Sequence, residues 1–434
     1  MTIEAVWFLI VGALMLLMAL GRKLVERLPM TGAMVYLIVG FLLGPAGAGL
    51  LTIDVERDVR LLRTLTEAGL VVSLFAIGMY LRVELSRPLW RLTLRLAGPA
   101  MLITIAVMFA AARWGLGLAA GPALLLASAL APTDPVLANE LRVEEAGDDE
   151  PLRFALSSEG GINDGAASPM VYIALALCGV SSLGSGNPWT FALAIAWGLA
   201  SALFFGWALG TGVVVLVTKL RTKYDHALGL EGFLALGLVA LAYGATLIVD
   251  GYAFIAVFAA GVALRRQEMK ATGDKPPSEV LESVERGERE EAAKDPELAH
   301  AYIAEHMMGF SVEIERFVEL GLMVIIGSVV SAHWRELIHW SVVWPVLFLF
   351  IVARPLGSTL SLIGSSMDRH QRLLSGWLGL RGVGAFYYLL FSLEQAGHDR
   401  VGPLLPILLA AIVLSVFVHG ASATPLLNRY LSRK

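Results

Sequence analysis

Two carboxylates and an amide lie within six residues of one apolar stretch, and such side chains can bind a cation or carry a proton. The stretch is FALSSEGGINDGAASPMVYIALAL, residues 154–177. Its second half is ordinary membrane-helix sequence, whereas its first half contains Glu159, Asn163 and Asp164. An ionisable side chain at the centre of a membrane helix costs about 2.5–3.5 kcal/mol on insertion scales. These residues therefore need an interior position, a partner or a role in transport.

The helical angles of this stretch separate its two carboxylates. At about 100° per residue, Glu159 and Asn163 lie within about 40° of each other, whereas Asp164 lies about 140° from Glu159. One carboxylate can then neutralise a buried cation while the other faces a cavity. We expect Glu159 to be structural and Asp164 to do the chemistry. In the alternative, all three residues cap a short helix at the cytoplasmic edge, which the adjacent Gly160 and Gly161 would suit.

A second polar stretch interrupts another apolar run. In LASALAPTDPVLANE, Pro132 and Pro135 surround Thr133 and Asp134. Each proline removes a backbone N–H group and disturbs the preceding turn, so we expect the helix to break there. Broken membrane helices line polar cavities, and transporters bind ions at their ends. The alternative is a simple proline kink with a helix-capping aspartate.

Two arginines also lie inside apolar runs. Glycines surround Arg381 in GWLGLRGVGAFYYLL, which predicts a second interrupted helix with a positive charge at the break. Asp134, or the exposed carbonyls of the other broken helix, are the expected acceptors. Arg354, in FLFIVARPLGSTL, has no opposite charge nearby in its own run and must find an acid on another helix. The alternative for both arginines is a side chain that extends to the membrane interface.

The elements that must position these residues are membrane helices. The 434 residues are 57% hydrophobic and 16% charged, whereas soluble proteins carry about 25% charged residues. Runs of about 20 apolar residues predict an all-α polytopic membrane protein of about 13 spans. No basic residue precedes the first run, which argues against a cleaved signal peptide. The expected spans are 5–21, 31–47, 67–81, 93–112, 122–138, 152–178, 190–218, 228–249, 252–264, 317–332, 341–363, 374–393 and 402–425.

The distribution of basic residues predicts the orientation. With the N-terminus outside and the C-terminus in the cytoplasm, most of the 33 Lys and Arg residues fall in cytoplasmic segments. We expect a multi-pass protein of the cell's inner (plasma) membrane. The one sizeable cytoplasmic loop is 265–316, which we expect to contain partial helix, and the stretch 298–320 is amphipathic and suited to the membrane surface. The loop is either a solvated connector or a regulatory element. Nothing resembles a nucleotide-binding domain, and no nucleotide or nucleic-acid partner is expected.

Together these motifs resemble the cation/proton antiporter superfamily, in its NhaP and NHE branch of sodium/proton exchangers. The matching stretches are PTDPVLA, SEGGINDGAA, VARPLG, GLRGVGAF and VHGASATPLL, in the family's order. The resemblance implies a NhaA/NhaP-like fold with inverted repeats, two crossing discontinuous helices, and a homodimer in the lipid bilayer. It further implies these segments: dimerisation-domain helices 1–3 in 1–90, core-domain helices 4–6 in 91–180, linker helix 7 in 181–225, dimerisation-domain helices 8–10 with the loop in 226–339, and core-domain helices 11–13 in 340–434.

The resemblance also implies an ion site. Asp164 would be the main carrier of cation and proton, and Asp134 with the Thr133 carbonyl would help to line the site. The transported Na⁺ would then have Asp164 and Asp134 as its acidic ligands. Asn163 would orient the site in place of the second aspartate of the electrogenic branch.

Three further charges would have supporting roles by the same resemblance. Glu159 would pair with Arg354 and hold the core together, and Arg381 would compensate charge at the helix crossing. One departure concerns Gly160, because many family members have a serine directly after the glutamate. A possible hydroxyl ligand is thereby lost.

These residues predict a transporter and not an enzyme. Cation and proton would compete for Asp164, which gives electroneutral exchange of Na⁺ or Li⁺ for H⁺ with no cofactor beyond the transported ions. The residues do not fix the size of the cation site, so K⁺/H⁺ exchange is the close alternative. A cation channel is a distant one. An intramembrane enzyme would need a catalytic pair, and Ser415 with His419 lacks an acidic residue nearby in sequence to orient it.

Overall fold

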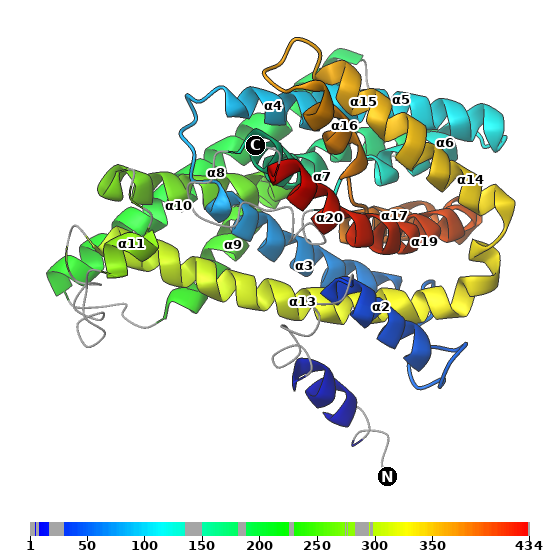
Figure 1. The fold of residues 1–434 in the computed structure, drawn as a ribbon, viewed down its shortest axis with the longest axis horizontal. Coiled ribbons are helices and arrows are strands. Elements are labelled where there is room, and N and C mark those ends of the chain that lie inside the picture. Colours follow the sequence, from blue (N-terminus) through cyan, green and yellow to red (C-terminus); the bar gives the residue numbers. More distant parts are fainter. Residues whose placement is uncertain are drawn as a thin grey trace.

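The chain was analysed as a computed structural model. It describes residues 5, 8–16, 30–134, 150–180, 188–224, 230–273, 275, 277–282, 295 and 298–432. Within these residues the regular structure is entirely helical, which confirms the predicted all-α fold (Figure 1). Residues 6, 7 and 17–21 of the expected span 5–21, together with Pro135 and the end of the span 122–138, lie outside the described residues.

The described helices follow the expected spans after the first. They are α2 (Gly32–Leu43), α3 (Val59–Tyr80), α4 (Leu89–Arg95), α5 (Met101–Ala110), α6 (Ala120–Leu130), α7 (Pro151–Leu177), α8 (Pro188–Tyr224), α9 (Glu231–Ile248), α10 (Ala253–Thr272), α11 (Pro277–Glu282), α13 (Ala299–Leu337), α14 (Trp340–Phe348), α15 (Arg354–Ser361), α16 (Arg369–Trp377), α17 (Val383–Ala396), α18 (His398–Val401), α19 (Leu405–Leu414) and α20 (Gly420–Leu431). Short π-helical turns join consecutive helices into longer ones. Among them, η4 (Leu349–Ala353) joins α14 to α15, and η6 (Ser415–His419) joins α19 to α20.

Seven described helices are long and apolar enough to cross a membrane. They are Val59–Tyr80, Leu89–Gly115, Trp189–Arg221, Glu231–Ile248, Ala299–Leu337, Trp340–Ser361 and His398–Leu431. Helices α2 and α6 are apolar but shorter. The outward faces of α8 and α9 carry large exposed apolar side chains, as a lipid-facing surface requires. Examples are Trp189, Leu193, Phe204, Phe233 and Ile248.

The helices pack in two groups that meet at α7 and α17. Helix α13 runs along one side of the molecule against α2 and α3, and α10 packs against α3 and α8 (Figure 1). On the other side, α7 packs against α4 and α6, and α15 packs against α5 and α16. Helix α17 contacts α3, and α7 contacts α10, so these two helices lie where the groups join.

The loop 265–316, expected to contain partial helix, is helical at both ends. Helix α10 continues to Thr272, and both Arg265 and Glu268 are buried in it. The stretch expected on the membrane surface is the first half of α13, which continues without a break to Leu337. Its apolar face, including Ile303 and Met307, is buried in the protein. An amphipathic pattern shows that one face needs apolar cover, and here neighbouring helices provide it instead of lipid.

Candidate functional site

Two interrupted helices meet in the interior. Helix α6 ends at Leu130, and residues 131–134 continue without helical structure. Five non-helical residues, 378–382, separate α16 from α17. The Asp134 backbone N–H donates a hydrogen bond to the Leu380 carbonyl at 2.8 Å, so the two non-helical segments touch. Pro132 lacks an N–H group and suits the first break. The expected breaks are therefore present at the end of α6 and between α16 and α17, and the two non-helical segments meet.

Each charge at the crossing faces a helix end of opposite polarity. The Arg381 guanidinium donates to the Ala131 carbonyl at the C-terminal end of α6. Oδ2 of Asp134 accepts from the Val383 N–H, at the first residue of α17. A helix carries partial negative charge at its C-terminus and partial positive charge at its N-terminus. Of the two acceptors considered for Arg381, the carbonyl is the one that its guanidinium contacts, and Asp134 caps α17 instead.

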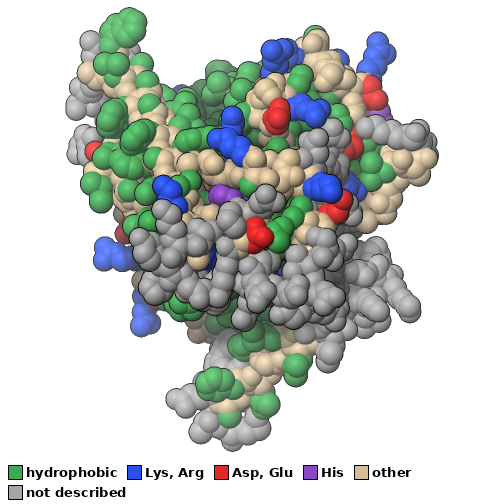
Figure 2. All heavy atoms as spheres, turned by 90° about the vertical axis from the view of Figure 1, so that its left-hand side faces the viewer, with side chains coloured by type: hydrophobic (Ala, Val, Ile, Leu, Met, Phe, Trp, Pro, Cys, Tyr) green, Lys and Arg blue, Asp and Glu red, His purple; other side chains and the backbone are tan. Residues whose placement is uncertain are grey.

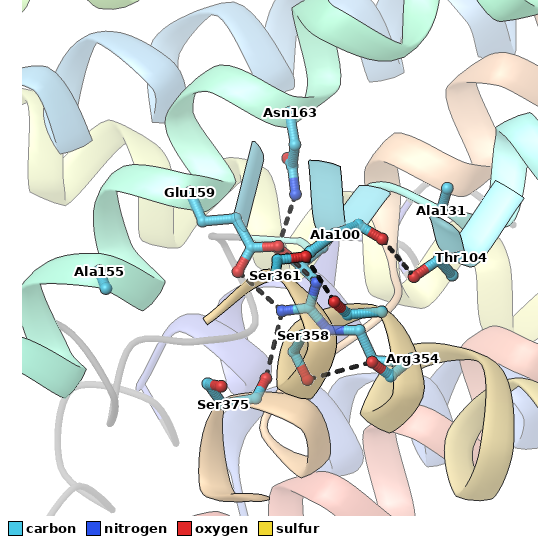
Figure 3. A network of polar contacts seen from close by, with 12 residues as sticks. Ala100, Thr104, Ala131, Ala155, Glu159, Asn163, Arg354, Ser358, Ser361 and Ser375 are labelled. Carbon is cyan, nitrogen blue, oxygen red and sulfur yellow. Dashed lines mark hydrogen bonds and ion pairs between the residues drawn. The ribbon is translucent and has the colours of Figure 1, made fainter. Parts of the chain in front are cut away.

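The Glu159 carboxylate and the Arg354 guanidinium form a two-pronged ion pair (Figure 3). The two N–O distances are 2.6 and 2.7 Å, and both side chains are buried. Arg354 also donates to the Ser375 carbonyl at 3.2 Å. Bidentate arginine–carboxylate pairs are strong and geometrically specific. The pair therefore ties α7, α15 and α16 together.

Gly379 makes room for this arginine. A Cβ atom at position 379 would lie 2.7 Å from Nε of Arg354. The π-helical turn η4 ends directly before Arg354, and Pro355 follows it. π-helical turns are common at functional sites. The missing side chain at Gly379 thus leaves space for the buried Arg354 guanidinium, and the turn η4 lies directly before this arginine in the chain.

Asp164 is a fully buried carboxylate whose oxygens have no hydrogen-bond donor among the described residues. The neighbouring Asn163 donates from Nδ2 to the Thr133 hydroxyl at 2.7 Å, which links α7 to the break after α6. Buried polar atoms are nearly always hydrogen-bonded, and an exception requires an explanation. A proton or a cation on Asp164 would satisfy these oxygens.

Sequence reasoning did not predict the contacts that two hydroxyl groups make near these residues. The Tyr388 hydroxyl donates to the backbone carbonyl of Asp164 and lies 3.0 Å from Oγ of Ser168. Oγ of Ser415 accepts from the Arg381 N–H at 2.7 Å and lies 3.1 Å from Nδ1 of His419. The pair considered for catalysis therefore holds the backbone of the second break. Tyr388 lies about two helical turns after the non-helical segment 378–382. This spacing could have identified it as a residue near the site.

Among the described residues, no group of three or more His, Cys, Asp or Glu side chains could hold a resident metal ion. The Asp164 carboxylate has no hydrogen-bond donor among these residues, whereas the hydrogen bonds of Asp134 join its segment to Leu380 and Val383. The arrangement suits a transient ligand at Asp164 better than a permanent metal centre.

Comparison with known proteins gives one family. A sequence profile described as "Sodium/hydrogen exchanger, transmembrane" matches residues 12–429. The curated protein "K(+)/H(+) antiporter NhaP" of Alkalimonas amylolytica is 24% identical over 423 residues, which are 96% of this chain and 65% of that protein. The chain thus spans about two thirds of the length of this relative.

Two solved structures share the fold. Both are of the sodium proton antiporter MjNhaP1 from Methanocaldococcus jannaschii. The structure at pH 8 has a TM-score of 0.66 and 19% identity, and the alignment covers 95% of this chain and 98% of that one. The electron-microscopy structure has a TM-score of 0.70 and 18% identity, with 100% and 99% covered.

Proposed function

Because this chain is a multi-pass membrane protein of the transmembrane sodium/hydrogen exchanger family, we propose that it exchanges a monovalent cation for a proton. The observation that carries the proposal is the buried carboxylate of Asp164, which has no hydrogen-bond donor among the described residues and lies beside the first turn of α17. A protonated carboxyl group holds a cation poorly, and a bound cation repels the proton. The two ligands therefore compete for one site.

Competition couples the cation flux to the proton flux if the site can change the side to which it opens only when its charge is neutralised. An empty Asp164 would carry a bare charge through an apolar barrier, which is costly. Oδ2 of Asp134 accepts from the N-terminus of α17. We propose that Asp134 helps to line the site and that Asp164 is the group that exchanges cation and proton. One carboxylate that trades one cation for one proton moves no net charge. The proposed exchange is electroneutral.

Na⁺, with Li⁺ as its smaller analogue, is the first proposed substrate. The family description and the name of the structural neighbour both refer to sodium. K⁺ is the alternative, because the curated relative is named a K⁺/H⁺ antiporter.

The proposed movement is a displacement of the segments 91–180 and 340–434 against the rest of the chain. Inside this unit, the Glu159–Arg354 pair and the Asn163–Thr133 hydrogen bond join separate helices. Across its boundary, Nε of Arg63 in α3 lies 2.5 Å from Oε2 of Glu394 in α17. Such a boundary contact must open when the unit moves.

The proposed setting is the inner (plasma) membrane, with the protein as a homodimer. Figure 2 shows the end of the molecule where α10 and α11 lie, with basic side chains spread over it. The excess of Lys and Arg expected on cytoplasmic loops supports the proposal that this end faces the cytoplasm.

The experiment measures proton flux in everted vesicles with a pH-sensitive dye. Adding Na⁺, Li⁺ or K⁺ should release accumulated protons, and the absence of release with every cation from about pH 6 to 9 would refute the proposal. Asp164→Asn should abolish the release at an unchanged protein level. Glu336→Gln, an exposed acid on α13, is the matched control and should transport normally.

A further inference from the structure

Gly384, in the first turn of α17, is the residue against which the Asp164 carboxylate packs. A Cβ atom at position 384 would lie 2.6 Å from Oδ1 of Asp164 and 3.3 Å from Oδ2. Favourable contacts between non-bonded heavy atoms lie at about 3.5–4.0 Å. Any larger residue at position 384 would therefore occupy the space beside the carboxylate.

Helix α17 cannot easily move away from Asp164. The Val383 N–H is bound to Asp134, which fixes the start of the helix. One turn after Gly384, the Tyr388 hydroxyl donates to the backbone carbonyl of Asp164. Residues four apart lie on one helix face. On this face of α17, Tyr388 binds the backbone carbonyl of Asp164. Gly384, on the same face, leaves space beside the Asp164 carboxylate.

Helix α7 also packs closely against α10 through an adjacent face. A Cβ atom at Gly161 would collide with the Phe258 ring, and one at Gly165 would collide with the Ile255 side chain. These glycines bring the two helices into close contact, so a shift of α7 toward α10 would meet the Phe258 and Ile255 side chains. An added methyl group at position 384 must therefore be accommodated by the Asp164 side chain and by whatever it binds.

We infer that Gly384 sets the size of the cation that Asp164 accepts. This inference rests on the proposed exchange function and concerns its selectivity. A bound cation needs volume next to the carboxylate for itself and its remaining oxygen ligands, and that volume increases from Li⁺ through Na⁺ to K⁺. A methyl group at position 384 removes part of this volume. The penalty therefore grows with the radius of the cation.

The test compares Gly384→Ala with the unmodified protein in two assays. The first is the half-saturating concentration of LiCl, NaCl and KCl for proton release from vesicles. The second is the thermal stabilisation of the purified protein by the same salts, which does not require transport. We expect the half-saturating Na⁺ concentration to rise about tenfold relative to that of Li⁺, and that of K⁺ to rise further. Gly321→Ala in α13, where an added Cβ atom meets nothing within 4 Å, is the control.

A uniform loss for all three cations, or unchanged ratios, would overturn the inference and leave the exchange function intact. If the unmodified protein shows neither proton release nor stabilisation by any cation, the exchange function fails as well. If Gly384→Ala does not fold, Gly384→Ala with Asp164→Ala should restore the folded yield, because the colliding carboxylate is gone. Failure of this double variant to fold would contradict the predicted contact.

Discussion

Removal of either half of the Glu159–Arg354 pair should destabilise the protein more than it changes cation affinity. The guanidinium donates to both carboxylate oxygens at 2.6 and 2.7 Å, and the side chains are 2% and 0% exposed. A hydrogen bond to a charged group contributes about 1.5–3 kcal/mol, so two contribute about 3–6 kcal/mol. Removing one partner of a buried pair typically costs about 3–5 kcal/mol. We expect a loss of this size for Glu159→Gln and for Arg354→Met.

The double variant Glu159→Gln/Arg354→Met should lose less than the sum of the two single variants. Each single variant leaves one unpaired charge in the interior, whereas the double variant leaves none. Exchanging the two charges should restore part of the stability. The measurement is the unfolding free energy of purified protein in detergent, completed as a double-mutant cycle.

Two outcomes would refute this reasoning about the pair. One is additive losses in the cycle, and the other is single variants that lose less than about 1 kcal/mol. The matched control is the exposed His333–Glu336 pair of α13, whose side chains are 29% and 54% exposed. Exposed pairs contribute about 0–1 kcal/mol, so Glu336→Gln should be nearly neutral.

Three further predictions concern the site and its stoichiometry. Tyr388→Phe removes the hydroxyl that binds the Asp164 carbonyl and should lower stability by about 1 kcal/mol; an unchanged thermal midpoint would contradict that contact. Arg381→Met leaves the Ala131 carbonyl and the end of α6 without a positive charge, so transport should fall at least tenfold, whereas Arg381→Lys should retain more of it; equal losses would refute the charge role. In proteoliposomes, cation-evoked proton flux should not respond to an imposed membrane potential, and a potential-dependent rate would exclude electroneutral exchange.

The sequence was sufficient to predict the interrupted helices and the separation of two carboxylates on one helix. Pro132 weakens hydrogen bonding locally, and the angle between Glu159 and Asp164 follows from helix geometry alone. The partner of Arg354 could be predicted only as an acid on some other helix. Its identity depends on how α7 and α15 pack, which no local pattern encodes.

The contacts that the sequence did not predict are those between distant segments. Whether Asp134 lines a cavity or caps α17 depends on which helix end lies beside it. The same holds for Gly384 and Tyr388, whose positions matter only because Asp164 faces them. The first half of α13 was misassigned for a related reason. Its amphipathic pattern does not distinguish lipid from neighbouring helices as the cover for its apolar face.

The central claim is that cation and proton compete for the carboxylate of Asp164. The most direct test is the half-saturating Na⁺ concentration of the unmodified protein, measured in proteoliposomes from about pH 6 to 9. One-to-one competition predicts that this concentration rises as the pH falls, approaching about tenfold per pH unit where the proton occupies the site. A half-saturating concentration that stays constant across this range would contradict the account.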